Sequence, residues 1–237
     1  MDLISFDRPS DSPFVERIWR SRSERAGPFI SIAENHWGMV ITKHNGRLTL
    51  TVRGPETKPT AADGLDDAEH FGIRFKTGAF MPHLPAGMVM DRRDLNLPDA
   101  SNRSFWLHGS VWQFPDFENV DTFVDRLAHE GLLVIDPVVE DILHGQPVNL
   151  SLRTAQRRFL QATGLTQGGY FQIERARQAI NLLKQGVSIL DTVAQAGYSD
   201  QPHLTRSLKQ FTGQTPSQIV RENSREPLSF LFKTKTF

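Results

Sequence analysis

The chain has 237 residues, no formal net charge and a hydrophobic content of 38%, values typical of a soluble globular protein with one large or two ordinary domains. It contains no cysteine, which excludes disulfides, thiolate catalysis and cysteine-ligated zinc. Its polar, acidic start does not resemble a signal peptide, and no apolar run approaches the roughly 20 residues that span a bilayer. We therefore expect a cytoplasmic protein with no membrane partner.

Residues 1–27 predict an irregular lead-in, followed by a first strand at residues 15–19. Basic side chains are concentrated at residues 17–22, and this run has two interpretations. It is either a second DNA-binding arm or, as we favour, the solvated edge of a strand.

From residue 29 onward, short β-branched segments bounded by turn residues predict four strands, at residues 29–33, 38–43, 47–53 and 71–75. Asn45-Gly46 has the composition of a two-residue hairpin turn between two of them. The Pro-, Thr- and Asp-rich residues 54–67 predict a loop. Short strands at this spacing predict a small barrel or sandwich.

Residues 78–97 predict a loop and a short helix that close one end of this barrel. The segment is rich in methionine, and its side chains either line an adaptable pocket or, as we favour, belong to the ordinary core. The sequence assigns no effector-binding residue.

Histidines are scattered singly through the N-terminal half, at positions 36, 44, 70, 83 and 108. They form no His-x-His pair, and no acid–base or nucleophilic constellation occurs at a useful spacing. We therefore expect no metal, no cofactor and no catalytic residue.

Residues 121–133 have the apolar spacing of an amphipathic helix, which would link the two halves of the chain or make a dimer contact. Asp136-Pro137 then predicts the start of another helix. The predicted fold class is α+β, with a β-rich sensor or dimerisation domain at residues 1–133, an all-α domain at residues 134–225 and a tail at residues 226–237.

The all-α domain contains two similar units, at residues 151–166 and 199–216. Each predicts a helix with one apolar face and one polar face, ended by a Thr-Gly pair in which glycine supplies the left-handed turn. A helical segment at residues 170–185 and a short one at residues 189–196 lie between them. A short helix, a turn at Gly197 and a polar-faced helix together indicate a helix-turn-helix.

The polar faces carry side chains that can read base edges. Arg can donate two hydrogen bonds to guanine, and Gln can pair with adenine in the major groove. Residues 151–221 also hold nine basic residues against three acidic ones, a net charge of +6 that the rest of the chain balances. A basic module beside an acidic partner favours a nucleic-acid binder over the alternative of a merely solvated basic face.

The spaced positions of this region resemble the AraC/XylS family of bacterial transcription regulators, over about the last third of the chain. The matching residues are Arg157, Phe159, Gly164, Tyr170, Arg175, Ala179, Leu182, Leu183, Ile189, Val193, Ala194, Gly197, Tyr198, Arg206, Lys209, Phe211, Gly213, Thr215 and Pro216.

The resemblance implies two helix-turn-helix units joined by a long helix, whose recognition helices enter successive major grooves about 34–36 Å apart. It implies base-reading roles for Arg153, Gln156, Arg157, Gln201, Pro202, Thr205 and Arg206. We expect backbone phosphates to be contacted by Arg158, Arg177, Lys184 and Lys209.

The resemblance further implies a cupin-like N-terminal barrel that binds a small-molecule effector or dimerises. Double-stranded DNA, RNA polymerase and a second copy of the chain are the partners it suggests. Three alternatives stay open: a first unit that grips only the DNA backbone, a non-specific architectural DNA binder, and a cupin-like enzyme with a regulatory DNA-binding appendage.

Overall fold

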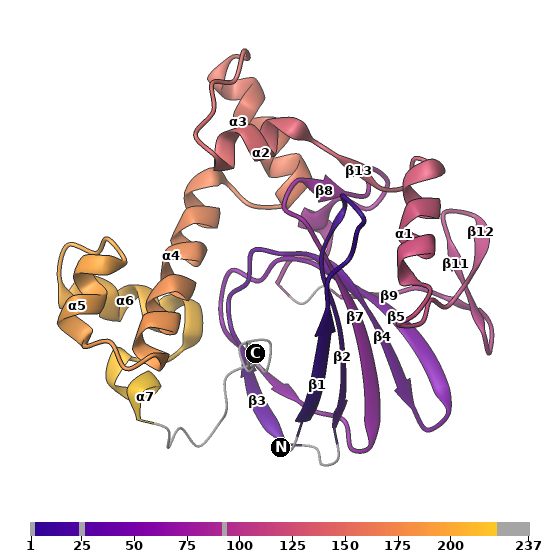
Figure 1. The fold of residues 1–237 in the computed structure, drawn as a ribbon, viewed down its shortest axis with the longest axis horizontal. Coiled ribbons are helices and arrows are strands. Elements are labelled where there is room, and N and C mark those ends of the chain that lie inside the picture. Colours follow the sequence, from indigo (N-terminus) through magenta and orange to yellow (C-terminus); the bar gives the residue numbers. More distant parts are fainter. Residues whose placement is uncertain (1–2, 24–26, 92–93, 222–237) are drawn as a thin grey trace. The chain divides into compact units, whose positions relative to one another are not determined.

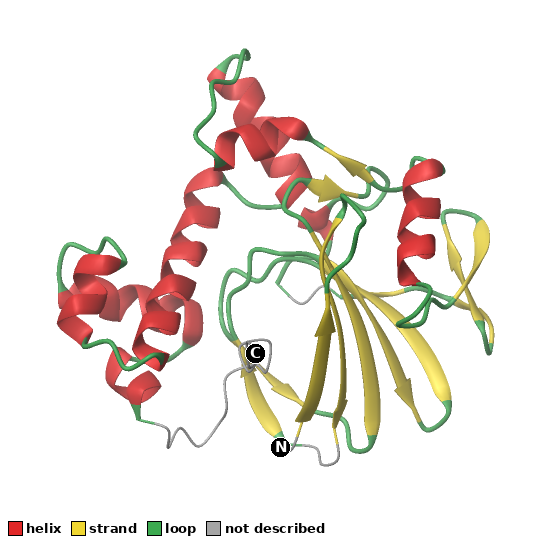
Figure 2. Ribbon diagram, in the orientation of Figure 1, coloured by secondary structure: helices red, strands yellow, loops and turns green. Residues whose placement is uncertain are grey.

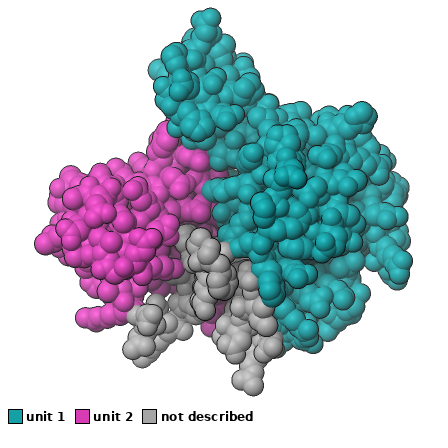
Figure 3. Space-filling model, viewed as in Figure 1, with its two compact units in different colours: residues 1–26, 36–55, 65–166 teal, residues 27–35, 56–64, 167–237 magenta. Residues whose placement is uncertain are grey.

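The computed structural model describes residues 3–23, 27–91 and 94–221, and the tail predicted at residues 226–237 lies outside them. The chain forms two compact units, each assembled from separate stretches of sequence (Figure 3). The first unit comprises residues 1–26, 36–55 and 65–166, and the second comprises residues 27–35, 56–64 and 167–237. This grouping does not test the domain boundary near residue 133, which stays a prediction.

An antiparallel sheet of six strands, in the order β1-β2-β7-β4-β5-β9, forms the base of the first unit (Figures 1 and 2). Its strands are β1 (Leu3–Arg8), β2 (Val15–Ser23), β4 (Gly38–His44), β5 (Arg47–Arg53), β7 (Ala68–Phe75) and β9 (Leu95–Asn96). The described strands leave β1 and β9 as unjoined edges, whereas a barrel requires its edge strands to pair. The six strands therefore do not close into the predicted small barrel.

Smaller elements complete the first unit, and most of them lie after the sheet in the sequence. They are β8 (Ala79–Phe80), the 3₁₀ helix η1 (Ala86–Met88), β10 (Asp99–Ser101), β11 (Ser104–Leu107), β12 (Ser110–Gln113), α1 (Val120–His129), β13 (Val134–Ile135), α2 (Pro137–Leu143) and α3 (Leu152–Thr163). β10, β11 and β12 form a three-stranded sheet, and β8 pairs with β13. The short helix predicted within residues 78–97 is present as η1.

One face of the six-stranded sheet holds the hydrophobic core, because alternate side chains of a strand point to the same side. Ile18, Met39, Leu50 and Ile73 are almost completely buried there. The apolar face of α1 packs into the same core through Val120, Phe123, Val124 and Leu127. This packing accounts for the amphipathic pattern of α1 without a dimer contact.

The basic run of residues 17–22 lies on an inner strand, because β2 is placed between β1 and β7. The favoured interpretation as a solvated strand edge is therefore wrong. The reason is that residues 3–8, which belong to the predicted irregular lead-in, pair with β2 along their whole length. Two of the arginines form ion pairs, Arg17 with Asp7 and Arg22 with Asp67.

The turn between β4 and β5 confirms the hairpin prediction. Asn45 and Gly46 have φ angles of 50° and 76°, and positive φ at both central residues is what this type of two-residue turn requires.

Among its described residues, the second unit combines a strand pair from the N-terminal half with four helices. Its elements are β3 (Pro28–Ser31), β6 (Thr60–Asp63), α4 (Gln167–Lys184), α5 (Ile189–Gln195), α6 (Gln201–Thr212) and α7 (Pro216–Val220). The helix α4 contacts α5, α6 and α7 and forms the centre of the helical group. β6 lies in the segment predicted as a loop; its sequence, Thr-Ala-Ala-Asp, has weak strand propensity, and antiparallel pairing with β3 forms the strand.

Candidate nucleic-acid interface

The helix α3 of the first predicted unit has well-defined ends. Ser151 caps its start by accepting a hydrogen bond from the Thr154 amide at 3.2 Å, and Gly164 ends it with a φ of 76°. Its buried face consists of Ala155, Phe159 and Ala162. The glycine end lies where the sequence predicted it, and so does the apolar face except for Leu152, which was predicted as part of that face and is exposed.

The helix α6 of the second unit repeats this construction. Asp200 caps it by accepting from the His203 amide at 2.6 Å, and Gly213 ends it with a φ of 75°. Its buried face consists of Leu204, Leu208 and Phe211. α3 and α6 have the same length of 12 residues, so residues can be matched one to one between them.

The last turns of the two helices share a buried threonine with the same hydrogen bonds. Thr163 donates to the Phe159 carbonyl oxygen at 2.7 Å and accepts from the Leu165 amide at 3.1 Å. Thr212 donates to the carbonyl oxygen of Leu208 at 2.7 Å and accepts from the amide of Gln214 at 3.1 Å. This shared ending supports a common design for the two units.

Six of the seven predicted base-reading residues are exposed, and the seventh, Thr205, is half-buried. None of their side chains makes a hydrogen bond or an ion pair within the part of the chain that the structure describes. The exposed residues are Arg153, Gln156 and Arg157 on α3 and Gln201, Pro202 and Arg206 on α6.

Equivalent positions of α3 and α6 carry Arg157 and Arg206, each with an exposed side chain. The same matching places Gln156 with Thr205 and Arg153 with Pro202. The second unit therefore offers fewer hydrogen-bond donors to a base edge than the first, and its arginine is its strongest candidate for a bidentate contact.

The short helix α5 and the helix α6 meet at a fixed turn. Ser188 caps α5 by accepting from the Asp191 amide at 3.1 Å, and Gly197 has a φ of 68° between the two helices. Tyr198 follows, and its hydroxyl shares a 2.9 Å hydrogen bond with the Ser207 hydroxyl. The guanidinium of Arg175 on α4 lies 4.8 Å from the centre of the Tyr198 ring, so the turn is held against both α6 and α4.

The four predicted phosphate-contacting residues have different surroundings. Lys184 and Lys209 are exposed. Arg158 makes two hydrogen bonds with Asp136, of 2.8 Å from Nε and 2.7 Å from Nη2. These bonds raise the pKa of Arg158 above its ordinary value. They hold the guanidinium against α2, away from the open position of a typical phosphate contact.

The fourth, Arg177, donates to the Asn35 side-chain oxygen at 3.0 Å. Asn35 is buried, and it donates to the Glu174 carboxylate at 2.6 Å. Asn35, from the N-terminal half of the sequence, thus bridges Arg177 and Glu174 of α4 within the second unit. Nothing in the local sequence signals this contact, because Asn35 and α4 are far apart in the chain.

Asp136 makes two kinds of stabilising contact. Besides its bonds with Arg158, it caps α2 by accepting a hydrogen bond from the Val138 amide at 3.0 Å. We expect Asp136→Ala to lower the free energy of unfolding by about 2 kcal/mol, through loss of the cap and of the Arg158 bonds. Urea denaturation measures the change. Glu140→Ala, an exposed substitution on the same helix, should change it by less than about 0.5 kcal/mol. Equal losses would show that Asp136 has no special role.

The residues described here contain no group of three or more histidine and acidic side chains placed to hold a metal ion. Across the same residues, every helix is too short or too polar to cross a membrane.

Residues 146–222 match the model of a family described as a helix-turn-helix domain. A region of 72 residues is 38% identical to the HTH-type transcriptional regulator RipA of Corynebacterium diphtheriae, covering 30% of this chain and 22% of that protein. Over 205 residues, the chain is 27% identical to RipA of Corynebacterium glutamicum, covering 78% of this chain and 60% of that protein. The matches therefore span less than two thirds of either relative.

One solved structure aligns over 93% of this chain and 98% of its own, with a TM-score of 0.37 and 9% sequence identity. It is ToxT from Vibrio cholerae O395 bound to (E)-4-(8-methylnaphthalen-1-yl)but-3-enoic acid. A likeness at this level supports no conclusion about fold or ligand.

Proposed function

Because the C-terminal region of this chain is an AraC-type helix-turn-helix domain, we propose that the protein is a sequence-specific transcriptional regulator that reads two successive major grooves of double-stranded DNA. The observation that carries this proposal is the repeated construction of α3 and α6. Two helices of equal length, with the same kind of cap and the same ending, present exposed arginines at the same position.

Two kinds of contact contribute to the proposed binding. Lys184 and Lys209 would supply phosphate contacts, which provide affinity without sequence preference. Arg158 and Arg177 would act mainly by holding the helices in place, since both are engaged by other side chains. The base-reading residues named above would supply specificity.

The sheet-rich part of the chain is proposed to control DNA binding in response to a small-molecule effector. The same proposal includes four further points that rest on the family resemblance. They are a cupin-like fold for this part of the chain, a homodimer, a contact with RNA polymerase and action in the cytoplasm. Both relatives carry the name of transcriptional regulators, which favours a non-enzymatic role.

Selection of binding sites from a random duplex library, with the full-length protein at near-physiological salt, tests the proposal. We expect one enriched site with two specified blocks about ten base pairs apart. Enrichment of a single block would mean that one helix-turn-helix unit contacts only the DNA backbone. An affinity ratio near one between enriched and random duplexes would overturn sequence reading and favour an architectural DNA binder.

A further inference from the structure

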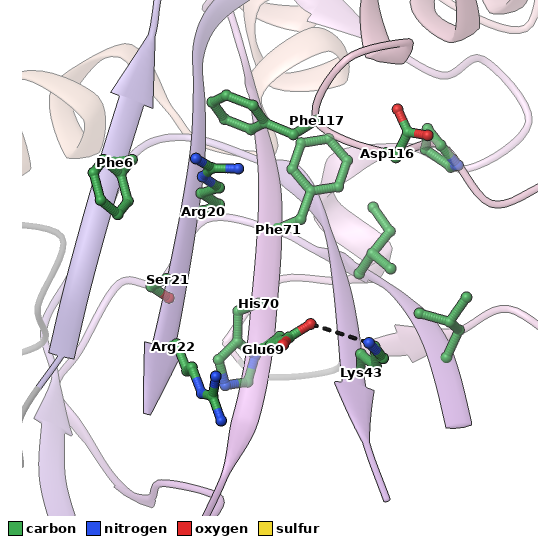
Figure 4. A pocket seen from close by; sticks show the side chains of 13 residues that line it. Phe6, Arg20, Ser21, Arg22, Lys43, Glu69, His70, Phe71, Asp116 and Phe117 are labelled. Atoms are coloured by element: carbon green, nitrogen blue, oxygen red, sulfur yellow. Dashed lines mark hydrogen bonds and ion pairs between the residues drawn. The ribbon is translucent and has the colours of Figure 1, made fainter. Parts of the chain in front are cut away.

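The face of the six-stranded sheet that holds the core of the first unit continues into a cavity of about 490 Å³ (Figure 4). This volume is in the range of pockets that bind small molecules. Its apolar lining includes Phe6 of β1, Ile41 of β4, Leu48 of β5 and Phe71 of β7, together with Phe117 from the loop before α1. Phe6 is 54% exposed, so its ring is accessible to a molecule bound in the cavity.

Arg20 of β2 lies beside this apolar surface. Its guanidinium carbon is 5.1 Å from the centre of the Phe6 ring and 4.7 Å from that of Phe117 (Figure 4). Such stacking occupies the face of a guanidinium, while its N–H groups point outward in the plane and match a carboxylate. Arg20 makes no ion pair or hydrogen bond from its side chain to any other described residue.

The other charged groups of the lining are already engaged. Lys43 pairs with Glu69 at 3.3 Å, and Arg22 pairs with Asp67 at 3.0 Å. Asp116 accepts hydrogen bonds from the backbone amides of Glu118 and Asn119.

His70, which also lines the cavity, adds no charge near neutral pH. Burial, with smaller contributions from the charges of Arg53 and His44, lowers its pKa to about 4. Arg20 is therefore the lining cation whose charge is not balanced by an acidic side chain among the described residues.

We propose that this cavity binds a small organic monoanion with a flat apolar body, whose carboxylate pairs with Arg20 and whose body lies on Phe6, Phe71 and Phe117. The combination of one unpaired guanidinium and several aromatic rings selects against neutral polar compounds such as sugars, which need many hydrogen-bonding partners. Cations are disfavoured by Arg20 itself. This inference rests on the effector control proposed above and names the ligand class for it.

Three indole compounds of similar size and different charge test the ligand class by isothermal titration calorimetry without DNA. Indole-3-acetate is an anion, indole-3-acetamide is neutral and tryptamine is a cation. We expect the anion to bind at least about tenfold more tightly than the amide, since a charge-assisted pair contributes more than a neutral hydrogen bond. Tryptamine should not saturate the protein at about 1 mM.

Arg20→Gln should remove the preference for the anion and leave weak, equal binding of acid and amide. Arg47→Gln is the matched control, because Arg47 is an exposed arginine outside the cavity lining and the change in total charge is the same. Phe71→Ala should weaken the binding of both compounds, because it removes part of the apolar surface. Thermal unfolding of each variant checks that it is folded.

Equal binding of acid and amide by the unmodified protein would overturn the proposal, as would an unchanged preference in Arg20→Gln. Because the titration contains no DNA, this failure would leave the proposed reading of two grooves untouched. A failed site selection would likewise not affect the titration.

Discussion

Arg206→Ala should weaken binding to the selected site by about 1–3 kcal/mol, which corresponds to roughly 5–150-fold in Kd. Arg206 is exposed on α6 and makes no ion pair or hydrogen bond within the described chain, so its guanidinium is available for a bidentate contact with guanine. The neighbouring positions, Pro202 and the half-buried Thr205, can replace little of that contact. Fluorescence anisotropy with a labelled duplex at fixed salt measures the change.

The loss should be confined to one block of the site. Arg157→Ala, at the equivalent position of α3, should loosen the other block by a similar amount. Lys209→Ala serves as the contrast, since loss of a phosphate contact weakens all sequences alike and reduces the salt dependence by about one charge. If Arg206→Ala weakened random and selected duplexes equally, Arg206 would be a backbone contact and its assigned role would be wrong.

Sequence patterns predicted α3 and α6 because the signals that set those helices are local. A capping side chain, a three-to-four-residue apolar spacing and a final Thr-Gly pair all lie within each helix or beside it. The same holds for the Asn45-Gly46 turn. In each of these helices and in the turn, the residues that carry the sequence signal lie within the element itself or directly beside it.

Elements that depend on distant partners were not predicted. β1 and β6 have modest strand propensity, and each is formed by pairing with β2 and β3 respectively. The sheet is open because its two edge strands do not pair with each other. The residue pattern of a single strand does not reveal which strand will pair with it, so the sequence could not predict this. The same limit applies to the candidate interface: the exposure of Arg206 follows from helical spacing, whereas the engagement of Arg158 by Asp136 and of Arg177 by Asn35 does not.

The left-handed glycines that end α3 and α6 provide a matched pair for a second large effect. Gly164 and Gly213 have φ angles of 76° and 75°, so alanine at either position incurs the left-handed penalty of about 1–2 kcal/mol. Their surroundings differ. A Cβ atom on Gly164 would lie 2.9 Å from the Gly87 backbone nitrogen and 3.1 Å from the Ala86 carbonyl carbon, both in η1. One on Gly213 would meet Pro59 at an ordinary 3.6 Å.

We expect Gly164→Ala to lower the free energy of unfolding by about 3–4 kcal/mol. The steric cost of placing a Cβ atom against η1 adds to the penalty for a left-handed alanine. Gly213→Ala should cost about 1–2 kcal/mol. Urea denaturation of both variants gives the comparison. Gly87→Ala is a further control: its Cβ would lie 3.8 Å from Gly164, so a loss below about 1 kcal/mol is expected.

If Gly164→Ala lowers the free energy of unfolding more than Gly213→Ala does, the close backbone approach between the end of α3 and η1 persists in solution. The helix α3 would then be held by a segment of the N-terminal half, and under the proposed function a change in that segment would alter how α3 meets DNA. Equal losses for Gly164→Ala and Gly213→Ala would mean that the two backbones separate easily. In that case α3 would be free to reorient, and control of DNA binding through η1 would have no physical basis.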